Sequence, residues 1–193
     1  MQAQEPIAAS AATIVNAGFL DTLAGAADAA QALALIDACR ARIAGGGIFS
    51  IQQNVTRADD APGQVLLRRF YSSAAGTFPV NGTKRKTLTR WTRCLFVEGR
   101  PFVGEGEAAL AEHFDDFEQM RAFGLRSVVN VPLMQGPLSY ATFNVFGTAA
   151  RWQPEQVFAF RLLALAAARW VPVAPGLSYR FDATEPADAG AAA

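Results

Sequence analysis

The sequence predicts an α+β fold in which one mixed or antiparallel sheet carries helices on both faces. Three observations support this: helix-period segments at both ends and in the middle, strands that follow one another in hairpins, and 51% apolar residues to fill a core. The 193 residues suit one domain with extensions. We expect a helical extension over 1–27, the domain over 28–172, and a disordered tail rich in Pro, Ala, Gly and Asp over 173–193.

The individual elements follow from periodicity and from turn residues between them. Apolar residues recur at helical spacing in some segments and alternate with polar ones in others. The expected helices are 5–20 (ending near Gly18), 28–43, 87–98, 107–123 and 154–171. The expected strands are 48–55, 65–72, 100–104 and the two arms of a hairpin over 126–146.

Residues at the ends of these segments support the boundaries. Asp28 and Gln31 have the spacing of a capping box, which predicts the start of the second helix. Gly124 suits the end of the helix over 107–123, because glycine accepts the left-handed conformation found at many helix ends. Pro154 suits the first position of the last helix. The segment 73–86 between two of these elements is expected to be a loop.

The hairpin gives the sharpest prediction of shared faces, because successive side chains of a strand point to opposite sides. One of its faces is almost wholly apolar and is expected to meet the helices at the two chain ends. The other is expected to meet the helices over 87–98 and 107–123. This second, mixed face carries Val128, Asn130, Tyr140, Thr142 and Asn144.

A ligand cavity has mainly apolar walls and a few convergent polar groups, which describes the mixed face. We therefore expect a small organic molecule to bind between this face and the middle helices. The candidate binding residues are Ser50, Gln52, Tyr71, Trp91, Phe102, Phe114, Phe117, Met120, Val128, Asn130, Thr142 and Asn144. The alternative is that the polar groups only satisfy loop backbone and that the aromatic side chains only fill a core.

Several motifs occur in a fixed order along residues 28–171. Leu95–Val103 contains Gly99-Arg-Pro-Phe102, Phe123–Ser127 is followed by Val131-Pro-Leu133, and Pro154-Glu155 opens the last helix. In this order they resemble the GAF family of small-molecule sensor domains, although Tyr140 stands where that family often has glycine. The resemblance implies a GAF-like fold and a non-enzymatic sensory or regulatory domain, acting as a dimer or through a signalling partner protein.

Specialised branches of the family fit less well. The Asn-Lys-Phe-Asp-Glu set of the cyclic-nucleotide branch cannot be assembled, and the residues that hold a bilin are not in the required context. Two alternatives stay open. One is a small reductase of the free methionine sulfoxide reductase type that uses Cys94, although that branch uses several cysteines. The other is an assembly module whose pocket is vestigial.

Charge and composition exclude other classes of function. Seventeen Lys and Arg balance 17 Asp and Glu, so no global field favours nucleic acid or a membrane surface. The run Lys84-Arg85-Lys86 is interpreted as solvated, and the lone His113 has no metal-ligand spacing around it, so no metal or cofactor is expected. No Lys or Arg precedes Arg40, which argues against a secretory signal and for a cytoplasmic protein with Cys39 and Cys94 as free thiols.

The last helix is apolar around most of its circumference, which predicts that more than one side of it is covered. Phe158, Leu162 and Leu165 are expected to face the sheet. Further apolar surface remains at Val157, Leu163, Ala164 and Ala167. We therefore expect a homodimer that uses the N-terminal and C-terminal helices.

Overall fold

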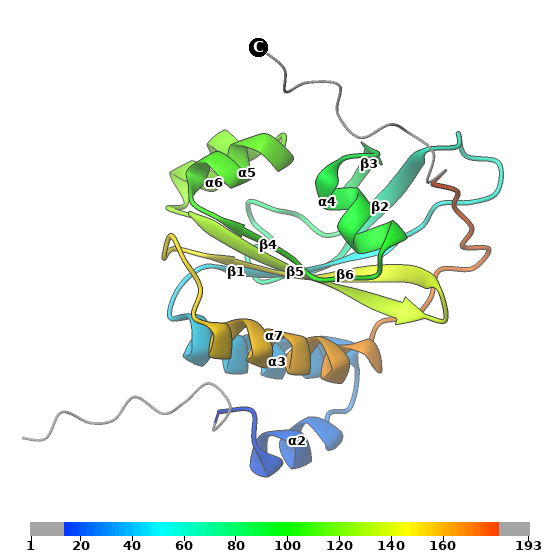
Figure 1. Cartoon of the computed structure of the whole chain (residues 1–193). Coiled ribbons are helices and arrows are strands. Elements are labelled where there is room, and N and C mark those ends of the chain that lie inside the picture. Colours follow the sequence, from blue (N-terminus) through cyan, green and yellow to red (C-terminus); the bar gives the residue numbers. More distant parts are fainter. Residues whose placement is uncertain (1–13, 182–193) are drawn as a thin grey trace, which may run out of the picture.

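The computed structural model describes residues 14–181. Figure 1 shows one sheet with helices on both of its faces, which confirms the expected α+β class. The strands are β1 (Ile48–Asn54), β2 (Gln64–Ser72), β3 (Thr83–Thr87), β4 (Phe102–Glu105), β5 (Ser127–Gln135) and β6 (Leu138–Gly147). Their order is β3-β2-β1-β6-β5-β4, and each neighbouring pair is antiparallel.

The helices form two layers around the sheet and a third, smaller one outside (Figure 1). In chain order they are α2 (Ala17–Ala24), α3 (Ala29–Ala44), α4 (Arg90–Thr92), the π-helix η1 (Arg93–Val97), α5 (Glu107–His113), α6 (Phe117–Ala122) and α7 (Pro154–Ala168). Helices α3 and α7 cover one face, and α2 lies outside them. We call α4, η1, α5 and α6, which cover the opposite face, the roof. In the described part of the chain no helix has the length and apolar character needed to cross a membrane.

The helix α3 begins where its capping residues predict. The Asp28 side chain accepts a hydrogen bond from the Gln31 backbone N–H at 2.8 Å, and the Gln31 side chain accepts one from Ala27 at 2.6 Å. Its end is marked by Gly45 at φ 78°. Across the layer, the Gln156 side chain of α7 donates to the Ile43 carbonyl at 2.9 Å. These bonds fix α3 and α7 beside one another under the sheet.

The expected sheet-facing stripe of α7 is wrong. Phe158 is 52% exposed and Leu165 is 75% exposed, so both point away from the sheet. The buried side chains are Ala159, Phe160, Leu163, Ala164 and Ala167. Both stripes have helical periodicity, so the period does not choose between them. The alanines allow α7 to approach its neighbours closely while the Phe160 ring fills the core, and the helix ends at Ala168 rather than at 171.

The two faces of the hairpin are arranged largely as alternation predicts. Val129, Val131 and Phe143 pack in the core under α3 and α7, whereas Val128 packs in the core under the roof. Tyr140 is the exception, since it belongs to the core on the α3–α7 side. The register of β5 and β6 shifts next to this position, and the Tyr140 hydroxyl donates to a carbonyl of α7 at 3.0 Å.

Two predictions near the roof are corrected. The run Lys84-Arg85-Lys86 is a strand, β3, and not a loop, because it pairs with β2 and forms the edge of the sheet, where lysines are well tolerated. The expected helix over 107–123 is two helices interrupted at Phe114–Asp116. Phe114 has extended backbone angles of −125° and 117°, and the two aspartates that follow are poor helix formers.

Two predictions near the chain ends are also corrected. The helix expected over 5–20 lies partly outside the described residues. Asn16 caps the start of α2, so Gly18 lies in the first turn of this helix and not at its end. The described part of the expected disordered tail is packed on the domain. Leu177 contacts the core under α3 and α7, while Tyr179 and Phe181 contact the core under the roof. The segment therefore crosses from one layer to the other past the sheet.

Candidate functional site

A cavity lies between the sheet and the roof. Its walls contain seven of the predicted binding residues, namely Ser50, Gln52, Trp91, Phe114, Met120, Asn130 and Asn144. The other lining residues were not predicted as binding residues, and these are Ile48, Arg69, Phe78, Lys84, Lys86, Asp116, Leu125 and Phe146. About 30 Å³ of this space can hold the centre of a water molecule, which is room for one or two waters.

Three side chains join the roof to the floor of the cavity by hydrogen bonds. The Trp91 indole N–H donates to Asn130 Oδ1 at 2.9 Å, and Asn130 Nδ2 donates to Asn144 Oδ1 at 2.6 Å. Asn144 Nδ2 in turn donates to the Thr142 carbonyl at 3.1 Å. Both amides are buried, so this chain satisfies groups that would otherwise be costly to bury. The two asparagines therefore anchor the roof.

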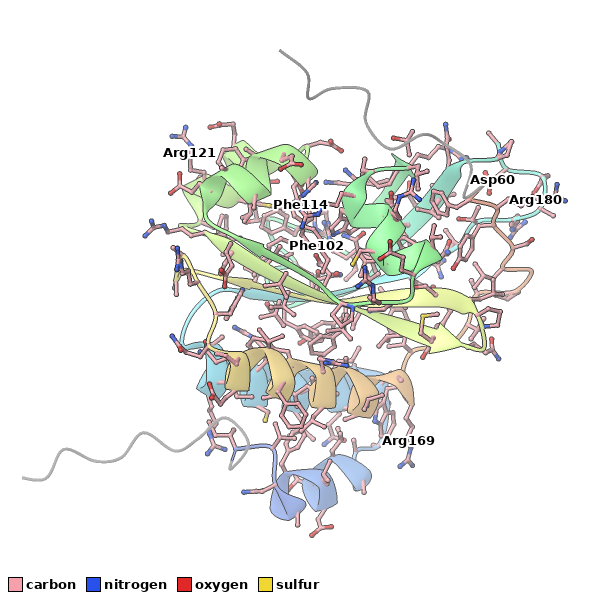
Figure 2. All side chains as sticks on the ribbon, in the orientation of Figure 1. Asp60, Phe102, Phe114, Arg121, Arg169 and Arg180 are labelled. Atoms are coloured by element: carbon pink, nitrogen blue, oxygen red, sulfur yellow. The ribbon has the colours of Figure 1, made fainter. Side chains whose placement is uncertain are left out.

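Aromatic rings form the apolar wall on the roof side. The Phe114 ring lies 5.8 Å from the Trp91 ring and 5.4 Å from the Phe146 ring, both edge-to-face. Figure 2 shows Phe114 in the layer between the α5–α6 region and the sheet. The break between α5 and α6 therefore has a structural result, because the extended backbone at Phe114 lets its ring enter this layer.

Charged side chains lie at the β3 side of the cavity. Lys84 pairs with Asp116 at 2.7 Å, and Lys86 pairs with Asp115 at 2.5 Å. These ion pairs connect the edge strand to the break between α5 and α6. The Lys86 ammonium holds the pKa of the Asp115 carboxyl below its ordinary value. Lys84 and Lys86, which alternation places on the cavity face of β3, thus connect the sheet to the roof by ion pairs.

Arg69 is a cavity residue with incomplete pairing. Its Nη1 donates to the Pro79 carbonyl at 3.2 Å, and its guanidinium carbon lies 5.6 Å from the centre of the Phe78 ring. Its Nε is buried and has no hydrogen-bond partner among the described residues. Burial lowers the pKa of Arg69, and the negative charge of Asp116 opposes that shift only in part.

Ser50 and Gln52 are the other polar side chains of the cavity that are not engaged. Neither the Ser50 hydroxyl nor the Gln52 amide makes a side-chain hydrogen bond to another residue between 14 and 181. Gln52 lies directly opposite Arg69 across the β1–β2 pairing. Alternation along β1 predicted the position of Ser50 and Gln52, whereas Lys84 and Lys86 were missed because β3 was taken for a loop.

Five predicted binding residues lie outside the cavity lining. They are Tyr71, Phe102, Phe117, Val128 and Thr142. Tyr71 lies on the opposite face of the sheet, where its ring is 5.3 Å from that of Phe49. The reason is an irregularity between Ile51 and Gln52 in the pairing with β2, which changes the alternation of β2. Thr142 faces the roof side, but its hydroxyl is buried and has no hydrogen-bond partner among the residues that the structure describes.

The two thiols lie on opposite faces of the sheet. Cys39 belongs to the core under α3 and α7, whereas Cys94 packs on the core under the roof, across the sheet. Burial raises the pKa of both thiols, and the negative charge of Glu98 raises that of Cys94 further. The Cys94 Sγ contacts the Pro101 carbonyl at 3.4 Å. A thiol with a raised pKa is a weak nucleophile at neutral pH.

His113 packs beside the site and does not enter it. Its side chain is 5% exposed, and its ring lies 4.9 Å from Phe102 in an edge-to-face contact. Burial lowers its pKa, while Glu112 raises it to a smaller extent. Within residues 14–181, no three His, Cys, Asp or Glu side chains are grouped as a metal site would require.

The fold is similar to that of solved GAF domains. The GAF domain of a phosphoenolpyruvate-protein phosphotransferase from Coxiella burnetii aligns with a TM-score of 0.63 at 13% identity, over 86% of this chain and 94% of that one. The corresponding Acinetobacter domain aligns with a TM-score of 0.56 at 10% identity, over 79% and 87%. The chromophore-binding domain of a bacteriophytochrome from R. palustris aligns with a TM-score of 0.54 at 12% identity.

The coverage differs among these structures. The match spans 79% of this chain but only 58% of the bacteriophytochrome domain. No protein-family model and no curated protein sequence matches the chain. At these identities the likeness concerns the fold, which is GAF-like.

Proposed function

We propose that this chain, which has a GAF-like fold, is a non-enzymatic sensory domain that binds a small organic molecule between its sheet and its roof. The observation that carries the proposal is the cavity itself, which combines aromatic walls with polar side-chain groups that have no hydrogen-bond partner within residues 14–181. Ligand sites have this composition. One compared structure of the same fold is named for chromophore binding.

The size of the cavity bears on how binding would be sensed. About 30 Å³ is open to water centres, far less than the roughly 300–1,000 Å³ of pockets for drug-sized ligands. An organic ligand therefore needs the roof to move outward. The ion pairs of Asp115 and Asp116 with β3 are partly exposed and so are weak restraints on that movement. Displacement of the roof is then the signal that binding produces.

The experiment is native mass spectrometry of the protein purified from its own host, followed by ligand-detected NMR with a fragment library of mixed charge. A retained mass or fragment binding that Gln52→Leu removes would support the proposal, because Gln52 lines the cavity. Gln135→Leu is the matched control, since Gln135 is exposed at the end of β5. Binding that both variants leave intact would contradict a site in this cavity.

The thiol chemistry argues for a binding role and against the reductase alternative. Cys94 has no second cysteine on its side of the sheet within residues 14–181, and its pKa is raised. A disulfide cycle needs a thiolate and a resolving thiol. We expect Cys94→Ser to keep ligand binding unchanged, whereas loss of a reductase activity in that variant would contradict the proposal.

We also propose that the outer surface of α2 and α7 joins two copies of the chain. Leu165 is 75% exposed, Phe158 is 52% exposed and Leu20 of α2 is 49% exposed. Exposed apolar side chains gathered on adjoining helices are typical of an interface. Two copies related by a two-fold axis would cover the same patch on each partner.

Light scattering during gel filtration tests the dimer. We expect a mass near twice the 20.5 kDa of one chain at micromolar concentration. Leu165→Lys should shift the protein to the monomer mass without unfolding it, because Leu165 is already exposed. Val103→Lys is the control, since Val103 is exposed on the edge strand β4. A wild-type monomer mass would contradict the proposal.

A further inference from the structure

We propose that the ligand of the cavity is a small organic carboxylate, held by Arg69 together with Gln52 and Ser50. The inference rests on the function proposed above and adds the chemical class of the ligand to it. The polar groups of the cavity without a hydrogen-bond partner between residues 14 and 181 are its starting point.

These free groups share one property, which is that each can donate a hydrogen bond. Arg69 Nε is a donor only, while the Gln52 amide and the Ser50 hydroxyl can donate as well as accept. Gln52 is paired with Arg69 across β1 and β2, and Ser50 lies two residues before Gln52 on the same face. The donors therefore lie side by side along one wall. A carboxylate offers only acceptor oxygens and matches such a wall.

The charge around the cavity also favours an anion. Arg69, Lys84 and Lys86 line it, and the lysines pair with Asp116 and Asp115. Arg69 lies in a partly buried place and forms no ion pair with a described carboxylate, and the negative charge of Asp116 compensates its positive charge only in part. Burial depresses the pKa of Arg69 despite Asp116, so this charge still lacks full compensation. A bound anion would supply it.

The remaining walls limit where the carboxylate can bind and how large the molecule is. Asn130 and Asn144 already bond to Trp91 and to each other, so the free donors are on the Arg69 side. The apolar part of the ligand would then face the rings of Trp91 and Phe114. With about 30 Å³ open to water centres, a compact carboxylate requires the smallest movement of the roof.

The test compares propionate with propionamide, which has a similar shape without the charge, by isothermal titration calorimetry at constant ionic strength. We expect propionate to bind at least about tenfold more tightly, as the loss of a charge-assisted hydrogen bond implies. Arg69→Gln should weaken propionate by a similar factor. Arg68→Gln is the matched control on the same strand, since Arg68 bonds to Gln53 instead of lining the cavity.

A second variant tests the inference by an expected gain in affinity instead of a loss. Asp116→Asn removes the carboxylate that forms an ion pair with Lys84. Propionate should therefore bind more tightly to this variant than to the wild type. Asp60→Asn is its control, because Asp60 pairs with Arg85 of the same strand, which does not line the cavity. Circular dichroism confirms that each variant is folded, and Arg69→Met replaces Arg69→Gln if the latter is not.

The outcomes separate the inference from the proposed function. The carboxylate assignment would be overturned if propionamide bound as tightly as propionate, or if neither Arg69→Gln nor Asp116→Asn changed the affinity for propionate. The proposed ligand of the cavity would then be neutral. Failure of propionate together with every fragment of the library would overturn both. Weaker binding in Arg69→Gln and tighter binding in Asp116→Asn support the carboxylate.

Discussion

Trp91 in the roof donates its indole N–H to Asn130 of the sheet strand β5 at 2.9 Å, and both side chains are buried. This is a direct polar link between the two layers that enclose the cavity. Asn130 continues the link by donating to Asn144. The position of the roof thus depends on side chains of the cavity floor.

Asn130→Leu should destabilise the protein through this link. The substitution leaves Trp91 Nε1 and Asn144 Oδ1 without partners, and each orphaned group costs about 1–3 kcal/mol. Urea unfolding measures the loss. In a double-mutant cycle with Trp91→Phe the effects should be less than additive, because both changes remove the same bond. Strict additivity would show that the bond does not couple roof and floor.

Thr142→Val, at a neighbouring position, should increase the free energy of unfolding. The Thr142 hydroxyl is buried and has no partner in the described part of the chain, so removing it relieves a desolvation cost with little change in shape. We expect a gain of up to about 1 kcal/mol in the free energy of unfolding. The same urea experiment serves, with Thr92→Val as a control. The Thr92 hydroxyl donates to the Thr87 carbonyl, so that variant should lose stability.

Much of the fold follows from the sequence, because period, capping and turn residues are local properties. The capping residues Asp28 and Gln31 mark the start of α3, and alternation along β5 places Asn130 on the roof side. Non-local effects explain the errors. The pairing of β3 with β2, and the irregularity that turns Tyr71 to the other face, depend on a partner strand that the local pattern does not reveal.

Strand pairing also accounts for the cavity residues that the sequence pattern did not predict. Ser50 and Gln52 could be assigned to the cavity from alternation in one strand. Arg69, Lys84 and Lys86 come from β2 and β3, where the register was unknown. Once β3 is placed beside β2, alternation puts Lys84 and Lys86 on one face. Spacing in the run Lys84-Arg85-Lys86 was thus a usable signal, but only with the strand assigned.

Acidification should weaken the fold through His113. Burial against Phe102 depresses its pKa in the native state below the ordinary 6.5, so the unfolded chain binds the proton more readily. The stabilising contribution of neutral His113 is complete above the unfolded pKa and is lost as the pH falls through the native pKa. Glu112 and Arg90 also act on this group, with opposite effects on its pKa.

The measurement is the free energy of unfolding between about pH 7.5 and pH 5.5, a range that brackets the ordinary histidine pKa. The wild type should lose stability across it, and His113→Phe should lose less. The difference between the two curves isolates His113 from the carboxylates, which titrate in both proteins. Parallel curves would mean that His113 does not carry the dependence.

Tyr179 should be required for the attachment of the segment that follows α7. Its hydroxyl accepts a hydrogen bond from the Ser139 backbone N–H at 2.8 Å and donates to the Phe96 carbonyl of η1 at 3.3 Å. Tyr179→Phe leaves the buried Ser139 N–H without a partner, at a cost of about 1–3 kcal/mol. Tyr179→Ala should cost more, since the edge-to-face contact with the Phe96 ring is also lost.

Hydrogen exchange shows whether this loss reaches the roof. Phe96 also contacts Trp91 edge-to-face, so Tyr179→Ala should speed amide exchange in η1 as well as at Ser139. Arg180→Ala is the control, because the backbone carbonyl of Arg180 accepts a hydrogen bond from the Gly63 N–H and that bond survives the change. Faster exchange confined to residues 174–181 would show that the segment rests on the roof without supporting it.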